Sequence, residues 1–463
     1  MAGGLRPATM DSGDWTWRMS KWPTEVVESD VGDQSLRLSR AELKAFMLSS
    51  LPSTTTITNP SFGAKPNGTT DSTQAFVDAW SAACASNDST TISVPKGRYL
   101  LPSAIKFSGD KCKTLDITFQ IDGTLIASSD YRILGQANNW LSFERVTGVS
   151  IIGGTLDAKG TALWACKLAA STGCPNGATS LRFTNSKNIS INGLTSLNSQ
   201  MFHIVVNGCQ DVYIRGVKVN AAGNSPNTDG IHVQLSRNVA IFNTSIKTGD
   251  DCVSIGPGMK DLWVEQISCG PGHGISIGSL AKDLEEEGVQ NVTVRNAIFK
   301  GTQNGLRIKS WPRPSSGFVQ GVQFIDAVML NVQNPIVIDQ NYCPRNINCP
   351  AQVGTSEEFD DATTGWLGRL LPVCPLALDS SIVSLAFSPG IASGVKISDV
   401  LYRNIQGTSG RAVAIKLDCS ATNPCSGIRL ENVSLTYRNQ VVQSHCTNVN
   451  GNTSGIVQPN SCL

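Results

Sequence analysis

Four short polar motifs recur in this chain at the same phase of an apolar alternation. They are Asn-Thr-Asp-Gly at 227–230, Gly-Asp-Asp-Cys at 249–252, Gly-His-Gly at 272–274 and Asn-Gly at 304–305. Each motif directly precedes an apolar anchor residue, and these anchors are Ile231, Val253, Ile275 and Leu306. If each anchor begins an equivalent strand on successive coils of a solenoid, the polar groups line up on one face.

The aligned groups have the chemistry of acid–base catalysis. They are three carboxylates, an imidazole, a guanidinium and an ammonium, from Asp229, Asp250, Asp251, His273, Arg307 and Lys309. Because stacked strands lie about 4.8 Å apart, the crowded carboxylates repel one another, which raises at least one proton affinity and lets that group act as an acid. Such a cluster is typical of glycoside hydrolysis, divalent-cation binding or turn caps. An Asp-Asp pair with a His on the next coil favours chemistry over capping.

Two cations indicate an anionic substrate. In Leu-Arg-Ile-Lys at 306–309, the strand alternation points Arg307 and Lys309 outward on one face, next to the acids. A solvated strand face would also carry such a pair. Beside an acid cluster, however, the pair suits a substrate whose sugars carry carboxylates.

The elements that position these groups are short strands in a repeat. A second pattern consists of a polar or Gly residue followed by two apolar residues with any residue between them. Its first apolar residue is Val149, Ile189, Val212, Val239, Leu262, Val292, Val322, Val395 or Ile428. From Ile189 onward the steps are 23, 27, 23, 30, 30, 73 and 33 residues, which is typical of a repeat architecture. Each repeat holds alternating segments separated by Gly, Asn, Asp or Ser turns, without the helical segment of a leucine-rich repeat. The pattern predicts an all-β fold, a parallel β-helix of roughly ten coils.

Composition agrees with a long solenoid core. The chain has 463 residues, of which 43 are Gly, 40% are hydrophobic and only 16% are charged. No apolar run approaches the length of a membrane span. A net charge of +1 gives no global attraction to nucleic acid or acidic membranes, so we expect neither as a partner.

Fourteen cysteines favour disulfides in an oxidising compartment over a metal site, because no CxxC pair is present. The spacing predicts five local pairs, Cys166 with Cys174, Cys252 with Cys269, Cys343 with Cys349, Cys419 with Cys425 and Cys446 with Cys462. Seven Asn-x-Ser/Thr sequons fit a secreted glycoprotein. The N-terminal segment nevertheless lacks the apolar core of a signal peptide.

Two stretches depart from the repeat. Residues 1–56 are polar, and we expect a poorly ordered extension before a catalytic domain at 57–463. The 73-residue step from Val322 to Val395 contains an excess of about 40 residues, which predicts an insertion at about 353–392. This insertion carries acidic residues, a helix-like apolar run and Cys374.

The chain resembles the polygalacturonases of glycoside hydrolase family 28, particularly those of plants. The resemblance rests on Ser-Pro-Asn-Thr-Asp-Gly-Ile-His at 225–232, Gly-Asp-Asp-Cys at 249–252, Cys-Gly-Pro-Gly-His-Gly-Ile-Ser at 269–276 and Arg-Ile-Lys at 307–309. It spans roughly 57–463 without the insertion.

The resemblance implies a right-handed parallel β-helix that hydrolyses α-1,4-galacturonosyl bonds of pectic homogalacturonan with inversion. By motif position, Asp250 would be the general acid, Asp229 and Asp251 would activate water, and His273 would tune the acid. Substrate contacts would come from Asn227, Arg307, Lys309 and Tyr342, and a Cys252–Cys269 disulfide would stiffen the site. His203 and His232 are expected to be packed or hydrogen-bonded, and not catalytic.

Two alternatives remain open. A pectate lyase on the same fold would need calcium and a basic residue near the bond, and the Asp250–Asp251 pair with His273 disfavours it. A non-catalytic pectin-binding β-helix is the other. The favoured interpretation implies no cofactor or metal, a pectic polysaccharide as partner, a monomer, and a secreted location in the cell wall.

Overall fold

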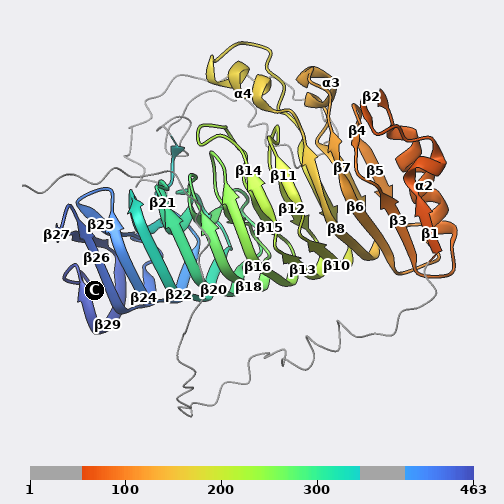
Figure 1. Cartoon of the computed structure of the whole chain (residues 1–463). Helices are drawn as coiled ribbons and strands as arrows, with labels where there is room; N and C mark the ends of the chain where they lie inside the picture. Colours follow the sequence, from red (N-terminus) through yellow and green to blue (C-terminus); the bar gives the residue numbers. More distant parts are fainter. Residues whose placement is uncertain (1–54, 345–391) are drawn as a thin grey trace, which may run out of the picture. The chain divides into compact units, whose positions relative to one another are not determined.

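The computed structural model describes residues 55–344 and 392–463, where short strands stack in parallel into coils (Figure 1). Each coil pairs in parallel with the next, and the fold is a right-handed parallel β-helix, as the sequence predicts. The predicted N-terminal extension lies almost entirely outside the described residues, as do most of the predicted insertion, Cys349 and Cys374.

Two sheets run along the described coils. The 11-stranded sheet consists of β5 (Ile105–Ser108), β7 (Asn139–Glu144), β9 (Thr179–Thr184), β12 (Ile204–Asn207), β15 (Ile231–Gln234), β17 (Val253–Ile255), β19 (Ile275–Leu280), β21 (Asn304–Ser310), β23 (Asn334–Asp339), β25 (Val413–Asp418) and β28 (Gln443–Thr447). The 18-stranded sheet consists of β1 (Thr55–Thr58), β2 (Asn67–Asp71), β3 (Thr90–Val94), β4 (Arg98–Leu100), β6 (Ile117–Ile126), β8 (Thr147–Asp157), β10 (Lys187–Asn192), β11 (Thr195–Leu197), β13 (Gln210–Arg215), β14 (Lys218–Asn220), β16 (Arg237–Lys247), β18 (Lys260–Cys269), β20 (Val289–Lys300), β22 (Phe318–Val332), β24 (Lys396–Ser409), β26 (Cys425–Tyr437), β27 (Gln440–Val441) and β29 (Val449–Gln458). The helical segments are η1 (Asn59–Phe62), α2 (Thr73–Ala85), α3 (Tyr131–Gly135) and α4 (Thr161–Leu168).

The anchor residues pair as the sequence predicts. Ile231 is in register with Val253, Val253 with Ile275, and Ile275 with Leu306. All four are buried, because the inward positions of each coil stack into a continuous apolar ladder. The four polar motifs therefore start equivalent strands on consecutive coils.

The second repeat is in the predicted register except at one step. The sequence pattern predicts that Val395 is the equivalent of Val322, and this is wrong. Val322 pairs with Val400, and Ile397 pairs with Val319. The reason is that the apolar alternation occurs twice, once from Val395 to Ile397 and again from Val400 to Tyr402. Asp399, a residue of positive φ, lies between the two copies. The coils on either side of residues 345–391 thus pair directly.

Asn and Asp recur near the starts of β13, β16, β18 and β20, because one residue there has a left-handed backbone. Asp211, Asn238, Asp261 and Asn291 all have φ between 53° and 58°, a conformation that Asn and Asp tolerate better than most residues. Their side chains also bond from coil to coil, since Asn238 Nδ2 donates to Asp211 Oδ1 at 2.6 Å and Asn291 Nδ2 to Asp261 Oδ1 at 3.0 Å.

Helix α2 covers the N-terminal end of the core, and the repeat pattern did not predict it. Its apolar residues recur with helical spacing, and the buried ones are Ala75, Phe76, Ala79, Trp80, Ala83 and Cys84. Trp80 packs on Phe107, Phe119 and Phe143 of the first coils at ring distances of 5.3 to 6.0 Å. A solenoid needs such a cap because its terminal coil would otherwise expose the apolar ladder.

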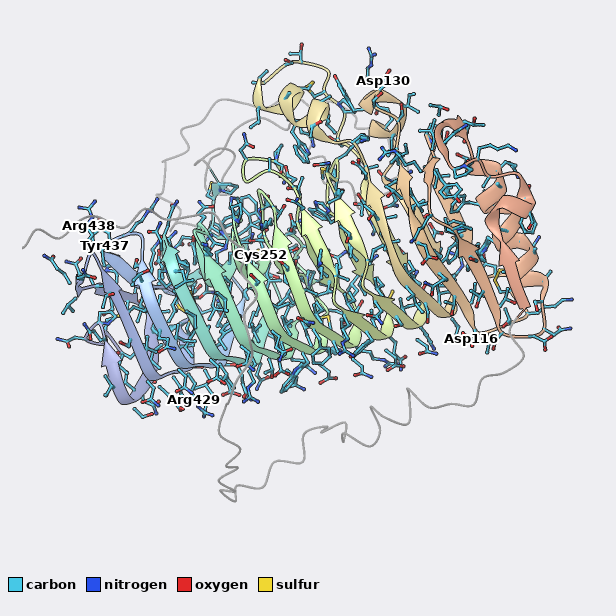
Figure 2. All side chains as sticks on the ribbon, viewed as in Figure 1. Asp116, Asp130, Cys252, Arg429, Tyr437 and Arg438 are labelled. Atoms are coloured by element: carbon cyan, nitrogen blue, oxygen red, sulfur yellow. A yellow bond between two sulfur atoms is a disulfide. The ribbon has the colours of Figure 1, made fainter. Side chains whose placement is uncertain are left out.

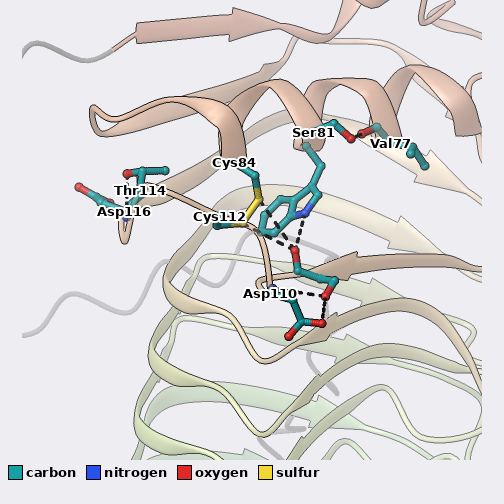
Figure 3. The surroundings of a disulfide bond; sticks show 9 residues. Val77, Ser81, Cys84, Asp110, Cys112, Thr114 and Asp116 are labelled. Atoms are coloured by element: carbon teal, nitrogen blue, oxygen red, sulfur yellow. Dashed lines mark hydrogen bonds between the residues drawn. A yellow bond between two sulfur atoms is a disulfide. The ribbon is translucent and has the colours of Figure 1, made fainter.

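Disulfides tie neighbouring segments together. Four of the five predicted pairs are present, namely Cys166–Cys174, Cys252–Cys269, Cys419–Cys425 and Cys446–Cys462. Cys343 is also disulfide-bonded, and its predicted partner Cys349 lies outside the described residues. A further bond, Cys84–Cys112, fastens α2 to the turn after β5 (Figure 3). Spacing missed it because the two cysteines are 28 residues apart.

Within 55–344 and 392–463, no helix has the length and apolar character needed to cross a membrane.

The register predicts that the insertion can be removed. We expect deletion of 354–392 to leave the thermal unfolding midpoint and soluble yield at least unchanged, because β22 and β24 pair directly and Asn404 Nδ2 still donates to Asp326 Oδ1 at 2.8 Å. Circular dichroism melting of both chains from one expression host measures this. A deletion variant that fails to fold would show that the segment is part of the solenoid.

Candidate active site

The predicted catalytic residues meet at the edge of the 11-stranded sheet where strands begin. Asp229 precedes β15, Asp250 and Asp251 precede β17, and His273 precedes β19. The backbone ladder continues through them, since Gly230 N donates to Asp251 O at 2.9 Å and His273 N to Asp250 O at 2.7 Å. The coil register therefore brings these side chains together.

The two glycines beside His273 let the coils approach closely. Gly272 has φ +151° and Gly274 has φ +91°. A Cβ on Gly274 would lie 2.2 Å from Asn304 O, and one on Gly272 would lie 2.8 Å from Asp250 O. Both positions thus require glycine, which fixes the backbone on either side of the imidazole.

Asp251 is the most heavily bonded acid of the site. Its Oδ1 accepts from Arg307 Nη2 at 2.9 Å and from Ser276 Oγ at 2.7 Å, and its Oδ2 accepts from Lys309 Nζ at 3.0 Å. Burial of the carboxyl opposes ionisation, but Lys309 and Arg307, together with Ser276, lower its pKa to about 2. Asp251 is therefore a fixed negative charge.

Asp229 has the opposite electrostatic environment. It is buried, and burial followed by the charges of Asp250 and Asp251 raises its pKa well above the usual range, against a hydrogen bond from Ser254 and the charge of Lys309. The crowding of Asp229 by Asp250 and Asp251 acts in the predicted direction, although burial is the larger cause. The acid with the raised affinity is Asp229, although motif position had singled out Asp250 as the proton donor.

Asp250 is the more accessible carboxyl. Its side chain is 20% exposed, whereas Asp229 and Asp251 are buried. One oxygen, Oδ1, lies 2.9 Å from His273 Nδ1 and accepts from Asp251 N at 2.9 Å. The position next to solvent and to an imidazole fits a group that exchanges a proton with a bound molecule.

The site also contains a possible donor set for a cation. One ligand atom from each of Asp250, Asp251 and His273 lies within 4.8 Å of the others. Both oxygens of Asp251 already bind cationic side chains, however. The two positive charges reduce the affinity of this set for a divalent metal ion.

The predicted substrate-binding residues lie around the acids. Asn227 is exposed in the turn before Asp229, with φ 53°. Arg307 and Lys309 lie on β21, where they are only 9% and 8% exposed and bind Asp251. Tyr342 follows β23, and its ring centroid is 5.2 Å from Lys309 Nζ. The role of these four residues toward a substrate stays a prediction.

Sequence reasoning missed the serines and the tryptophan that support these groups. Ser276 bridges Asp251 and Arg307 Nε, which donates to its Oγ at 2.9 Å, and Ser254 lies beside Asp229. Trp311 packs edge-on against Tyr342 at 5.4 Å. The outward phase of both serines, one coil apart, was the available signal.

Two further histidines, His203 and His232, are packed or hydrogen-bonded, as predicted. His203 is fully buried with Nδ1 2.8 Å from Ser196 Oγ. His232 stacks on Phe202 at 5.2 Å, and its Nδ1 lies 2.8 Å from Ser254 Oγ.

The Cys252–Cys269 disulfide lies directly behind the acids, with Cα atoms 5.9 Å apart (Cys252 is labelled in Figure 2). Because Cys252 follows Asp251, the bond anchors the acidic turn to the end of β18. The expectation that this pair stiffens the site is consistent with that position.

Two isosteric substitutions should change stability in opposite directions. Asp229→Asn removes a carboxyl whose folded-state pKa is raised, so its ionisation costs stability as pH rises. We expect this variant to melt above wild type at neutral pH, with the gap closing in acid. Asp251→Asn leaves Arg307 and Lys309 unpaired and should cost about 3–5 kcal/mol at neutral pH.

Melting curves from pH 8 to pH 2 test both changes. The wild-type advantage over Asp251→Asn should fade only below about pH 4, the usual aspartate range, as pH falls toward the folded-state pKa of about 2. If both variants shift in the same direction at neutral pH, the division of charge between the two acids is wrong.

Known proteins resemble this chain in sequence over most of its length. The model of glycosyl hydrolases family 28 matches residues 84–358 and 384–462. A Prunus persica protein named polygalacturonase is 53% identical over 419 residues, which cover 90% of this chain and 96% of the relative. An exopolygalacturonase from Platanus acerifolia is 39% identical over 398 residues, covering 85% and 94%.

Solved structures share the fold. The endo-xylogalacturonan hydrolase of Aspergillus tubingensis has a TM-score of 0.66 at 24% identity and covers 87% of this chain and 100% of its own. The polygalacturonase of Erwinia carotovora has a TM-score of 0.61 at 23% identity, covering 87% and 98%. The family model and both plant relatives match most of the chain. The chain therefore belongs to glycosyl hydrolases family 28, in the plant polygalacturonase group, and is a glycoside hydrolase.

Proposed function

We propose that the chain hydrolyses α-1,4-galacturonosyl bonds of pectic homogalacturonan with inversion at the anomeric carbon. The observation that carries the proposal is the stacking of three carboxylates and an imidazole on consecutive coils. Two cations lie on β21, which is two strands beyond β17, the strand that Asp251 precedes. A relative that is 53% identical and named polygalacturonase supports the same substrate class.

Asp250 donates the proton to the leaving oxygen. It is the accessible acid, and the His273 imidazole 2.9 Å away can return a proton to it after each turnover. A general acid must reach the glycosidic oxygen directly, and the two buried carboxyls are less able to do so.

Asp229 and Asp251 hold the attacking water. Asp251 remains ionised because two cations bind it, and it orients the water as an acceptor. Asp229 in its ionised form takes the proton as the water attacks.

The substrate carboxylate next to the scissile bond binds Arg307 and Lys309. Each cation can bind Asp251 and a sugar carboxylate together, since both have several donors. Tyr342 presents its ring beside Lys309 and contacts the sugar, while Asn227 reaches it from the opposite turn.

The chain acts outside the cell, in the cell wall, as a monomer. Disulfides such as Cys84–Cys112 and Cys252–Cys269 support an oxidising compartment. Plant relatives named polygalacturonase support a pectic partner.

One assay on polygalacturonate distinguishes the candidate functions. A hydrolase releases saturated reducing ends with chelator present, and proton NMR of the first product shows the inverted anomer. A lyase would instead need calcium and give an ultraviolet-absorbing unsaturated product. A binding protein would retain the polymer and release neither product, which would refute hydrolysis.

Asp250→Asn tests the acid. Because general acid catalysis is commonly worth about 10² to 10⁴ in rate, we expect kcat on polygalacturonate to fall by that factor while the dissociation constant changes only a few fold. Asp110→Asn, at a surface ion pair with Arg145 far along the coils, is the matched control and should keep wild-type kcat. Near-normal turnover of Asp250→Asn would remove this residue from the role of acid.

Lys309→Ala tests the cations. We expect KM on polygalacturonate to rise, and wild-type KM to rise with added salt through screening of the same attraction. Lys309 also helps to lower the pKa of Asp251, so the acidic limb of the pH–rate profile should move to higher pH in the variant. If KM, the salt response and the acidic limb all match wild type, Lys309 does not act in this way.

A further inference from the structure

Asparagines at the left-handed corners of the 18-stranded sheet bind the preceding coil. Asn238 and Asn404 each donate through Nδ2 to an aspartate of that coil, at 2.6 and 2.8 Å. Asn291 donates in the same way to Asp261 at 3.0 Å, and Asn432 donates to the amide oxygen of Asn404 at 3.3 Å. At these corners the side-chain amide is therefore part of the contact between coils.

Two asparagines at such corners lack this partner. Asn188 and Asn243 have φ of 53° and 48°, and both are exposed. The register places a glycine opposite each of them on the preceding coil, Gly148 for Asn188 and Gly216 for Asn243. Neither asparagine side chain has a hydrogen-bond partner among the residues that the structure describes. Their Nδ2 atoms are therefore available for another bond.

Both of these asparagines begin a glycosylation sequon. Asn188 is followed by Ile-Ser, and Asn243 by Thr-Ser. Asn291 and Asn432 begin sequons too, but a sugar on either Nδ2 would crowd the bond to the preceding coil. The four positions share the left-handed corner and differ in this contact, so the chain provides its own comparison. Three further sequons, whose asparagines do not have positive φ, begin at Asn67, Asn87 and Asn452.

An aromatic patch lies beside Asn243 on the outward face of the 18-stranded sheet. It consists of Tyr213, Phe242 and Trp263, which come from three consecutive coils. The rings of Tyr213 and Phe242 are 5.4 Å apart, and Trp263 is 40% exposed. Only the small side chain of Ala240 separates Tyr213 from Trp263 in the register. Adjoining exposed aromatic groups mark a surface that another molecule covers, and Phe242 directly precedes Asn243.

We propose that Asn188 and Asn243 carry N-linked oligosaccharides, and that the first sugars on Asn243 cover the aromatic patch. The co-reactant is a lipid-linked oligosaccharide pyrophosphate. A bond forms between Nδ2 and the anomeric carbon of the sugar, the bond from that carbon to the pyrophosphate oxygen breaks, and Nδ2 releases one proton. The assignment rests on the extracellular location proposed above. It does not involve the acids, because both asparagines lie in strands of the 18-stranded sheet, β10 and β16.

Mass spectrometry of the peptides tests the assignment on the full chain secreted from plant cells behind a cleavable signal peptide. We expect a glycan on Asn188 and on Asn243 in most molecules. We expect one on Asn291 and Asn432 in few, because a chain that loses the bond between coils folds poorly and is not secreted. A bare Asn188 or Asn243, or equal occupancy of all four positions, would overturn the assignment.

Ser245→Ala tests the cover over the aromatic patch. It removes the sequon but leaves Asn243 in the left-handed conformation that asparagine tolerates, so the corner still folds. We expect this variant to bind more 8-anilinonaphthalene-1-sulfonate than wild type, because the dye binds exposed apolar surface. Ser434→Ala is the matched control, since it changes the sequon of Asn432 on the same sheet, and it should bind the dye like wild type.

Equal dye binding by wild type and Ser245→Ala would show that no glycan covers the patch. Neither the peptide masses nor the dye depend on turnover. A secreted wild type that carries both glycans and leaves polygalacturonate intact would therefore refute the proposed hydrolysis and support the glycan sites.

Discussion

The structure depends on one constraint, the residue-for-residue register of parallel strands on successive coils. Once Ile231, Val253, Ile275 and Leu306 stack in the core, every side chain at a given offset from them is placed about 4.8 Å from its equivalent. The register therefore converts motifs that are 20 to 30 residues apart into a single cluster. It also imposes the repulsion among like charges that the site uses.

The three carboxylates have different neighbours, so the repulsion affects their proton affinities to different extents. This difference allows them to take different roles in acid–base catalysis. Arg307 and Lys309 bind one acid, Asp251, and hold it ionised. At Asp229, burial and the charges of Asp250 and Asp251 outweigh the opposing charge of Lys309, so its proton affinity rises. Asp250 remains at the surface beside His273. Three chemically identical side chains thus acquire three different environments from their position on two coils.

The same register explains why the fold tolerates irregular segments. Strands β22 and β24 pair directly although 345–391 intervene in the chain, because coil contacts depend on which strands stack and not on the length of the connection. At the other end, α2 and the Cys84–Cys112 bond close the core where the described coils begin. Departures from the repeat are therefore confined to turns and ends, away from the stacked anchors.

The sequence by itself determined the coil anchors, the fold class, the members of the acid cluster and four disulfides, because each is encoded in local spacing or in a period of two. It did not determine α2 or the Cys84–Cys112 bond, because both lie outside the period of the coils. It also took Val395 as the equivalent of Val322 where the structure has Val400, since the apolar alternation occurs twice there. Only the tertiary structure decided which acid the cations hold. Arg307 and Lys309 are 56 and 58 residues from Asp251 in the sequence. The burial and the charge pairing of Asp251 depend on side chains from several coils, and no local sequence pattern contains this information.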